Sequence, residues 1–459
     1  MAFIFEGNDA LYKKIDKYFN FNKEVETISD LNEIFFHKKN KFFLKVEKEY
    51  SEEGKEFIKI YQYLQKLALN IKEILPIKEI PLLKTKEKKR SLKLTRRQVA
   101  LLFLLSFFKI IENTHRFNVY YILDSNSGVR FQFGRCFLNY LITIGKWLEK
   151  EDKEKGKEVK DTESKTTEPK EVDTKGAKKT ETTETKEEEK EKYNILDEYI
   201  IYIRDNIESQ EYLENGNKDL CEITLNEKDS LFDGKESSYC IDFANKYIGG
   251  GALTGGCVQE EILFAVEPEA TVSMLFMEVM DENDAIGIYN TIEFSKYTGY
   301  GSTFKFEKSA ITDDLSLNKI KKHKIIAIDA IVSRGYFSFF SHSKTKDINR
   351  DIHKAYVGFN LVNFETEKDT QKIISTGNWG CGAFGGNHEL KFIQQWIAAS
   401  FVPIKRLDYY TFDDSRMKIV VENYNKIKEK YKTANSLYNA INKENIHIEE
   451  GKVIINLLK

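Results

Sequence analysis

The chain has 459 residues, more than one typical domain of roughly 100 to 200 residues, so two or three structural units are expected. Hydrophobic residues make up 41% of the sequence, enough for sizeable cores, and a net charge of −2 excludes a chain that is basic throughout. Five widely spaced cysteines without a C-x-x-C pair argue against a disulfide framework, and the histidines do not join them at zinc-ligand spacing, so no metal site is predicted.

The first 75 residues are predicted to be helical, because apolar side chains recur at three- and four-residue spacing. One such stripe is formed by Ile58, Tyr61, Leu64 and Leu67. A second helix is predicted from Thr95 to about Ile111, with Thr95 as its N-cap and Gln98 three residues later. Its apolar run, residues 99–108, is about half of the roughly 20 residues that cross a membrane, and the N-terminus carries no signal-peptide pattern. We therefore expect a buried helix and no membrane contact.

Residues 149–192 differ from the rest of the chain in composition. Their only apolar side chains are Val159, Val172 and Ala177. Such a segment cannot bury enough surface to offset the entropy of ordering it, so disorder is predicted, and its mixed charges do not indicate an RNA-binding tail. The sequence therefore divides into a helical accessory region at 1–148, a charged disordered linker at 149–192 and a folded unit at 193–459.

The folded unit alternates strand-like and helix-like stretches. Strands are predicted at 324–332, 355–362, 372–376 and 407–412, and helices at 389–401 and 416–432. This alternation indicates an α/β fold with a layered sheet.

Two glycine-rich segments hold the candidate functional residues. The first contains Gly249, Gly250 and Gly251 and ends with Gln259, Glu260 and Glu261. Glycine lets the backbone approach a ligand closely, and the residues after Glu261 are predicted to form a helix with both carboxylates near its positive end. A glycine-rich surface turn followed by an ordinary acidic first turn is the alternative.

The second segment, Thr376 to Gly386, has a G-x-G-x-x-G pattern between a predicted strand and a predicted helix. Its glycines are Gly380, Gly382 and Gly385. In this context backbone N–H groups bind diphosphates, as in Rossmann sites, although the motif alone is weak and lies late in the chain. The residues by themselves predict a ligand with a diphosphate and a bond cleaved by acid–base chemistry.

At these residues the chain closely resembles poly(ADP-ribose) glycohydrolases of the eukaryotic type. The family signature of three glycines, six to eight residues and Q-E-E is present at 249–261. Ordered matches around it are DFAN at 242–245, YTGY at 297–300, AIDA at 327–330, GNWGCGAFGG at 377–386 and TF-x-DS at 411–415. The resemblance is strong from about residue 195 to 459 and weaker before the linker, where IPLLK stands at 80–84.

The resemblance implies a macrodomain-like catalytic domain at 193–459, a three-layer α/β/α mixed sheet, joined to an N-terminal helical accessory region. It implies hydrolysis of ribose–ribose O-glycosidic bonds in poly(ADP-ribose), mainly from the chain end, with release of ADP-ribose. The implied partners are poly(ADP-ribose) and poly(ADP-ribosyl)ated proteins. No cofactor, no metal and no sequence-specific nucleic-acid binding are expected.

By the same resemblance, Glu261 is the acid that protonates the leaving ribose oxygen and then the base towards water. Glu260 orients ribose hydroxyls, and Asp242 and Asn245 anchor the ribose, although a loop cap is a serious alternative for Asp242. The remaining residues implied to bind substrate are Gly249, Gly250, Gly251, Gln259, Tyr300, Asn378, Gly382, Ala383, Phe384, Gly385, Gly386 and Phe412.

Several of these assignments have a structural alternative. A turn-forming role fits Asn378 nearly as well, and a core position is the ordinary role of an aromatic residue such as Phe412 at a strand end. Cys381 has no evident histidine partner and is expected to be a small filler residue. An acidic residue that binds the adenine amine is expected near Asp233, without assignment to one position.

Two other classes of protein share parts of the pattern. A non-catalytic macrodomain that only binds ADP-ribose would keep both loops, although the intact Q-E-E motif argues against it. A Rossmann oxidoreductase would rest on the late G-x-G-x-x-G alone. A nuclear or cytoplasmic location, or both, is expected from the substrate class, and the basic run at 88–90 fits a nuclear signal as well as a solvated approach to a helix.

Overall fold

The computed structural model describes most of the chain, with gaps. The residues outside the description are 1–2, 5–8, 21–24, 38, 77–78, 113, 115, 166–192, 228–230, 232–237, 313–314, 334–344, 365–371 and 444–451. The predicted adenine-binding position near Asp233 lies outside the described residues.

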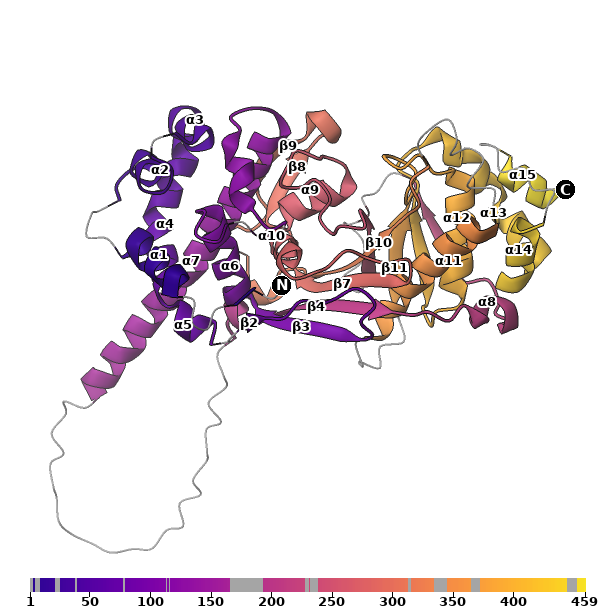
Figure 1. Cartoon of the computed structure of the whole chain (residues 1–459), viewed down its shortest axis with the longest axis horizontal. Helices are drawn as coiled ribbons and strands as arrows, with labels where there is room; N and C mark the ends of the chain where they lie inside the picture. Colours follow the sequence, from indigo (N-terminus) through magenta and orange to yellow (C-terminus); the bar gives the residue numbers. More distant parts are fainter. Residues whose placement is uncertain are drawn as a thin grey trace, which may run out of the picture.

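The first part of the chain is helical, as predicted, and its helices gather at one end of the molecule (Figure 1). They are α1 (Asp9–Phe19), α2 (Ile28–Phe36), α3 (Lys41–Glu49), α4 (Ser51–Leu69), α5 (Ile71–Ile74), α6 (Arg96–Phe107) and α7 (Gly128–Lys165). The predicted stripe on α4 packs inward, with Tyr61, Leu64 and Leu67 buried. Helix α6 begins after Thr95, which forms the predicted capping box with Gln98.

Two corrections concern the predicted boundaries of this region. Helix α7 continues to Lys165, so the beginning of the segment predicted to be disordered is helical. Residues 166–192 of that segment lie outside the described residues. In addition, β3 (Arg90–Thr95) belongs to the main sheet, although the sequence placed it in a helical region. Strand pairing with a segment more than 100 residues away decides this, and local helical spacing does not report it.

The described strands include an eight-stranded mixed sheet with the order β3-β4-β7-β10-β6-β11-β12-β5. After β3, its strands are β4 (Tyr199–Asn206), β5 (Ile223–Asn226), β6 (Ser238–Ala244), β7 (Asp284–Thr291), β10 (His323–Asp329), β11 (Ile373–Gly377) and β12 (Arg406–Tyr410). The run from β10 through β6, β11 and β12 to β5 is parallel, whereas β3, β4 and β7 pair antiparallel with their neighbours. Two small ribbons pair β1 (Phe3–Ile4) with β2 (Glu79–Ile80) and β8 (Ser295–Thr298) with β9 (Lys305–Ser309).

Helices cover both faces of the sheet. They are α8 (Glu211–Asn215), α9 (Gln259–Val266), α10 (Pro268–Thr271), α11 (Thr345–Asn360), α12 (His388–Ser400), α13 (Lys418–Tyr431), α14 (Ala434–Ile441) and α15 (Val453–Leu458). Successive residues of β10 point to opposite faces, as a strand requires. Ile325 and Ala327 join the core shared with α9, α10 and the N-terminal helices, whereas Ile326 and Ile328 join the core under α11 and α12. The fold is the predicted three-layer α/β/α arrangement.

The predicted elements of the α/β unit are confirmed with one exception. Strands stand at 323–329, 373–377 and 406–410, and helices at 388–400 and 418–431. The stretch 355–362, predicted as a strand, is instead the end of helix α11 followed by a short 3-10 turn. A short apolar run is typical of a buried strand and of a buried helix alike, and here α11 buries it against the sheet.

The molecule has two hydrophobic cores, one towards each end. The N-terminal helices and α9 and α10 share one continuous core with one sheet face, and α11 to α15 lie at the opposite end (Figure 1). Within the described part of the chain, no helix is both long enough and apolar enough to cross a membrane.

Candidate active site

A cleft of about 940 Å³ opens where the parallel strands end. The segments that follow β6, β11 and β12 all contribute to its walls, because the carboxyl ends of parallel strands meet at one edge of a sheet. Of the predicted site residues, those lining it are Asn245, Gln259, Glu260, Glu261, Tyr300, Asn378, Gly382, Ala383, Phe384 and Phe412. The structure thus brings together residues from two glycine-rich segments separated by more than 100 positions.

The two glutamates lie in the first turn of α9, as predicted, and the glycine loop wraps around them. Glu260 accepts hydrogen bonds from the backbone N–H groups of Asn245 at 2.8 Å and Gly249 at 2.7 Å. Glu261 accepts from Gly251 and Val258, both at 2.9 Å. Each carboxylate oxygen therefore has one backbone donor and keeps a second lone-pair direction for other partners.

Gln259 is tied to the sheet rather than free in the cleft. Its side-chain carbonyl accepts from the N–H of Phe243 at 2.8 Å, and its amide donates to the carbonyl of Ile241 at 3.2 Å. These two bonds link the backbone of β6 to the first residue of α9. Gln259 thereby fixes the start of the helix that carries both glutamates.

Asp242 lies behind the two glutamates and not in the cleft wall. Its side chain is fully buried, and neither carboxylate oxygen has a hydrogen-bond partner among the described residues. Burial, together with the charge of Glu261, raises the pKa of Asp242 well above its usual range. Direct contact between Asp242 and a ribose, the sequence-based expectation, does not fit this position.

The same environment acts on Glu260. Burial raises its pKa well above the usual range, the charge of Asp242 adds to the effect, and the N–H groups of Asn245 and Gly249 oppose it. Three carboxyl groups thus share one water-poor region, and among the described residues none of them forms an ion pair. For Asp242 and Glu260 this environment favours the protonated form, and perturbed carboxyl groups of this kind are typical of catalytic sites.

The loop around the glutamates has no room for side chains. A methyl group at Gly250 would lie 2.5 Å from a carboxylate oxygen of Glu260 and 2.5 Å from one of Glu261. Gly250 also has φ of +47°, in the left-handed region that favours glycine. Gly249 and Gly251 complete the loop through their N–H groups, so the three glycines position the carboxylates and do not line the cleft themselves.

The second glycine loop lies between β11 and α12, in the context that the sequence predicted. It is closed by hydrogen bonds from the N–H of Gly386 to the carbonyl of Gly380 at 2.9 Å and from Gly385 to Gly382 at 3.1 Å. Around Gly382 there is open space, so a ligand can approach the backbone there. The loop leads into the N-terminus of α12, where the helix dipole favours an anion.

Asn378 holds this loop to the neighbouring strand. Its amide donates to the carbonyl of Thr411 at 3.1 Å, and its side-chain oxygen accepts from the hydroxyl of Tyr409 at 3.2 Å. Although Asn378 lines the cleft, these bonds support the structural alternative named for it. Cys381 is buried, in keeping with a filler role.

Two aromatic side chains stand exposed at the cleft. Tyr300 is 59% exposed and Phe412 is 45% exposed. A core role for Phe412 is therefore wrong, because a core aromatic would be buried. Phe412 has a backbone φ of +57°, which is strained for a residue with a side chain and points to a functional constraint on its position.

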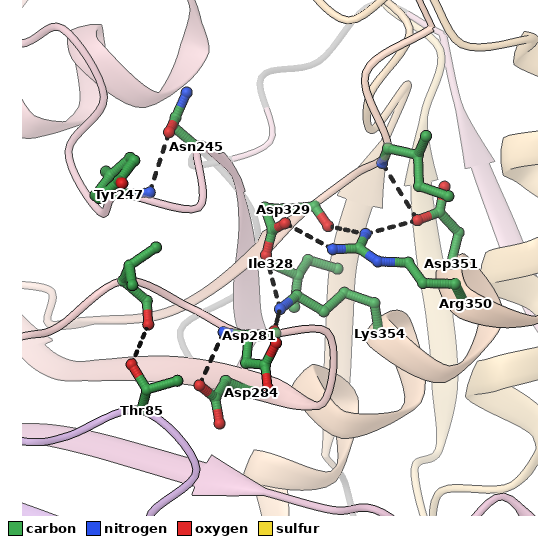
Figure 2. Close-up of polar contacts among 12 residues, drawn as sticks. Thr85, Asn245, Tyr247, Asp281, Asp284, Ile328, Asp329, Arg350, Asp351 and Lys354 are labelled. Atoms are coloured by element: carbon green, nitrogen blue, oxygen red, sulfur yellow. Dashed lines mark hydrogen bonds and ion pairs between the residues drawn. The ribbon is translucent and has the colours of Figure 1, made fainter. Parts of the chain in front are cut away.

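A cluster of buried charged residues lies next to the second glycine loop, and Figure 2 shows its members Asp329, Arg350, Asp351 and Lys354. Asp329, at the end of β10, contacts Arg350 and Lys354 of α11, both at 2.7 Å. Asp351 contacts Arg350 at 2.8 Å and also pairs with Lys391 of α12. A methyl group at Gly386 would lie 3.0 Å from the Lys391 side chain, so this lysine packs directly beneath the loop.

The structure adds cleft residues that the sequence analysis did not identify. His388, Asp414 and Arg416 line the cleft near Phe412. Arg416 pairs with Asp414 at 2.7 Å and, as the largest influence, lowers the pKa of that carboxyl to about 2. Asp414 belongs to the TF-x-DS match, which was the available signal, whereas nothing local marked His388. Among the described residues, no group of three or more His, Cys, Asp or Glu side chains is arranged to hold a metal ion.

Two family models match the chain. Residues 210–419 match the model described as poly (ADP-ribose) glycohydrolase (PARG), Macro domain fold. Residues 49–159 match the model of the helical domain of the same family. The two matches fall on the α/β unit and on the N-terminal helices, in the order that the structure shows.

Individual relatives agree with these models. Poly(ADP-ribose) glycohydrolase 1 of Arabidopsis thaliana is 33% identical over 258 residues, 42% of this chain and 46% of the relative. Poly(ADP-ribose) glycohydrolase 2 of Caenorhabditis elegans is 35% identical over 226 residues, 46% of this chain and 45% of the relative. Each alignment thus spans less than half of the relative's length.

A solved structure also matches part of the chain. It is poly(ADP-ribose) glycohydrolase from Thermomonospora curvata bound to the inhibitor ADP-HPD. The match has a TM-score of 0.30 and 15% sequence identity, and covers 44% of this chain and 75% of that one.

Proposed function

Because the chain belongs to the poly(ADP-ribose) glycohydrolase family, we propose that it hydrolyses ribose–ribose O-glycosidic bonds in poly(ADP-ribose), mainly from the chain end, and releases ADP-ribose. The observation that carries the proposal is the carboxyl cluster of Asp242, Glu260 and Glu261, which meets the cleft at the N-terminus of α9. A protein that only bound the polymer would gain nothing from three buried carboxyl groups that, among the described residues, have no ion-pair partner and cost free energy to keep in place.

Glu261 is the proposed acid and base. Its carboxyl group donates a proton to the ribose oxygen that leaves, and the bond between the anomeric carbon and that oxygen breaks. The resulting oxocarbenium ion is positively charged and is stabilised by the carboxylate of Glu261. The ion is then attacked by water, whose proton passes to Glu261 and restores the acid.

The other residues bind and orient the substrate. Glu260 accepts hydrogen bonds from ribose hydroxyl groups, and burial, together with the charge of Asp242, keeps the pKa of Glu260 high. The loop 380–386 and the N-terminus of α12 bind the diphosphate through backbone N–H groups. The exposed rings of Tyr300 and Phe412 stack on adenine, each worth on the order of 1–3 kcal/mol. Poly(ADP-ribosyl)ated proteins in the nucleus or cytoplasm are the proposed partners.

The second candidate function is a non-catalytic reader of ADP-ribose. It keeps the diphosphate loop and the aromatic rings but has no use for the carboxyl cluster. A Rossmann oxidoreductase is disfavoured, because the sheet has an antiparallel part and the G-x-G-x-x-G segment follows β11, far from the start of the domain.

The test is incubation of the purified full chain with long poly(ADP-ribose) and separation of the products by chromatography. We expect ADP-ribose from the wild type, and none from Glu261→Gln at matched times, while that variant still binds ADP-ribose by calorimetry. Glu307→Gln, which changes an exposed glutamate on β9, is the matched control and should match the wild type. Binding without release by the wild type would make the protein a reader. Accumulation of ADP-ribose from the earliest times, without short oligomers, would support cleavage from the chain end.

A further inference from the structure

The glycine loop that holds the two glutamates is itself held by a residue of the helical region. Arg116 lies between α6 and the 3-10 turn at Val119–Asp124, in the part of the chain that precedes the linker. We propose that Arg116 is a positioning residue for the reaction, because its guanidinium group holds the two peptide groups that hold the two glutamates. This inference rests on the proposed function and deepens it.

The contacts form two parallel relays. One Arg116 amino group donates to the carbonyl of Ile248 at 2.8 Å, and the N–H of the same peptide group, on Gly249, donates to Glu260. The other amino group donates to the carbonyl of Gly250 at 3.2 Å, and the N–H of that peptide group, on Gly251, donates to Glu261. Each peptide group is thus bonded on both sides, with the cation at its oxygen and a carboxylate at its nitrogen.

This arrangement strengthens the bonds to the carboxylates. A cation at the carbonyl oxygen polarises the peptide group, so its N–H becomes a better donor, and chains of hydrogen bonds reinforce one another in a water-poor site. The loop makes its own turns through the carbonyls of Tyr247, Gly249 and Gly251. Within the described residues, the carbonyls of Ile248 and Gly250 accept hydrogen bonds from Arg116 alone, so no other group replaces it.

Arginine suits this position better than lysine. Its planar fork presents donors in a fixed geometry and reaches two acceptors at once, whereas lysine offers a single point charge. The guanidinium carbon also lies 5.2 Å from the centre of the Tyr247 ring, which adds a cation–π contact within the same loop.

The segment that presents Arg116 is held in place from both sides. The amide of Asn118 donates to the carbonyl of Thr114 at 2.8 Å, and the N–H of Asn118 bonds to the carbonyl of Arg116 at 3.1 Å. Ser106 of α6 accepts from the N–H of Val119 at 2.9 Å. The guanidinium group is therefore fixed relative to α6. The helical region in this way contributes directly to the geometry of the glutamates.

The experiment compares Arg116→Ala and Arg116→Lys with Arg97→Ala in the full chain. Arg97, in the first turn of α6, forms ion pairs with Glu151 at 2.9 Å and Asp197 at 3.2 Å, and neither of these partners belongs to the glycine loop. For Arg116→Ala we expect kcat on poly(ADP-ribose) to fall about 10- to 100-fold, the range that a small misplacement of catalytic groups produces, with a much smaller change in KM. Arg116→Lys should recover only part of the loss, and Arg97→Ala should keep the wild-type kcat.

Two further measurements separate positioning from a general loss of structure. Added methylguanidinium should restore part of the activity of Arg116→Ala and none of that of Glu261→Gln. Hydrogen exchange of the loop 245–258 should become faster in Arg116→Ala while exchange in α11 and α12 stays unchanged. The exchange measurement does not depend on activity, so it tests the inference even if the wild type proves inactive and the proposed function fails. Unchanged loop exchange in Arg116→Ala, or a wild-type kcat in that variant, would overturn the inference.

Discussion

Two clusters of buried acidic residues lie at the same edge of the sheet and are built in opposite ways. In the first, Asp242, Glu260 and Glu261 have no ion-pair partner among the described residues. In the second, Asp329 and Asp351 are paired with Arg350 and Lys354 (Figure 2), and Asp351 is also paired with Lys391.

The difference is visible in the pKa values. Burial acts to raise the pKa in both clusters. In the first it prevails, and the pKa values of Asp242 and Glu260 rise well above their usual range. In the second, the positive charges of Lys391 and Arg350 outweigh burial, and the pKa of Asp351 falls. Burial therefore raises the pKa of these carboxyl groups only where no cation is paired directly with them.

The largest expected contrast concerns Glu261. We expect Glu261→Gln to lower kcat by about 10²- to 10⁴-fold, the usual contribution of a general acid or base. The melting temperature of this variant should change little, because glutamine has nearly the size of glutamate and loses only one acceptor for a backbone N–H. Parallel kinetics and thermal unfolding check this. A large drop in melting temperature would mean that the first cluster also serves stability.

The opposite result is expected for Asp351. Asp351→Asn leaves Lys391 and part of Arg350 buried without their counter-charge, so we expect a loss of about 3–5 kcal/mol in the free energy of unfolding. Denaturant titration measures it. Asp347→Asn, on the same helix but only partly buried, is the matched control and should leave stability nearly unchanged. Equal stability of the two variants would contradict the structural role of the second cluster.

A side chain that crowds the first cluster should reduce activity, because it displaces the carboxylates of the two glutamates. Gly250→Ala places a methyl group 2.5 Å from oxygens of both glutamates, and we expect kcat to fall roughly 10- to 100-fold. Gly301→Ala has similar backbone strain, with φ of +59°, but its methyl group meets its nearest neighbour at 3.9 Å. Steady-state kinetics on both variants separate the effect of the steric clash from that of backbone strain. If Gly301→Ala lost as much activity, backbone strain alone would explain the effect.

The smallest effect is a change in how stability depends on pH. The folded-state pKa of Asp242 is raised above its ordinary value of 3.8, so the protonated group contributes stability that is present at low pH and is lost as pH rises towards the folded-state pKa. Asp242→Asn cannot ionise, so its stability relative to wild type should increase as pH rises above about 4, by about 1.4 kcal/mol for each unit of pKa shift. Unfolding titrations across this range test it, and parallel curves for the two proteins would refute it.

Local chemistry in the sequence determined much of the fold and of the site. Thr95 and Gln98 predicted the start of α6, because a capping box involves only neighbouring residues. The strand periodicity and the glycine patterns predicted β10, β11, α12 and both loops. The Q-E-E motif placed Glu260 and Glu261 in the first turn of a helix, where the structure has them.

Only the tertiary structure decided which groups face one another. The sequence assigned Asp242 to the ribose, but β6 directs it behind the glutamates, where burial and the charge of Asp242 together raise the pKa of Glu260. It assigned 355–362 to a strand, because an apolar run does not distinguish a buried strand from a buried helix. It offered no signal for Arg116, whose role arises from contacts with a loop more than 130 residues away. Pairing, burial and charge balance depend on distances through space, and these exist only once the chain has folded.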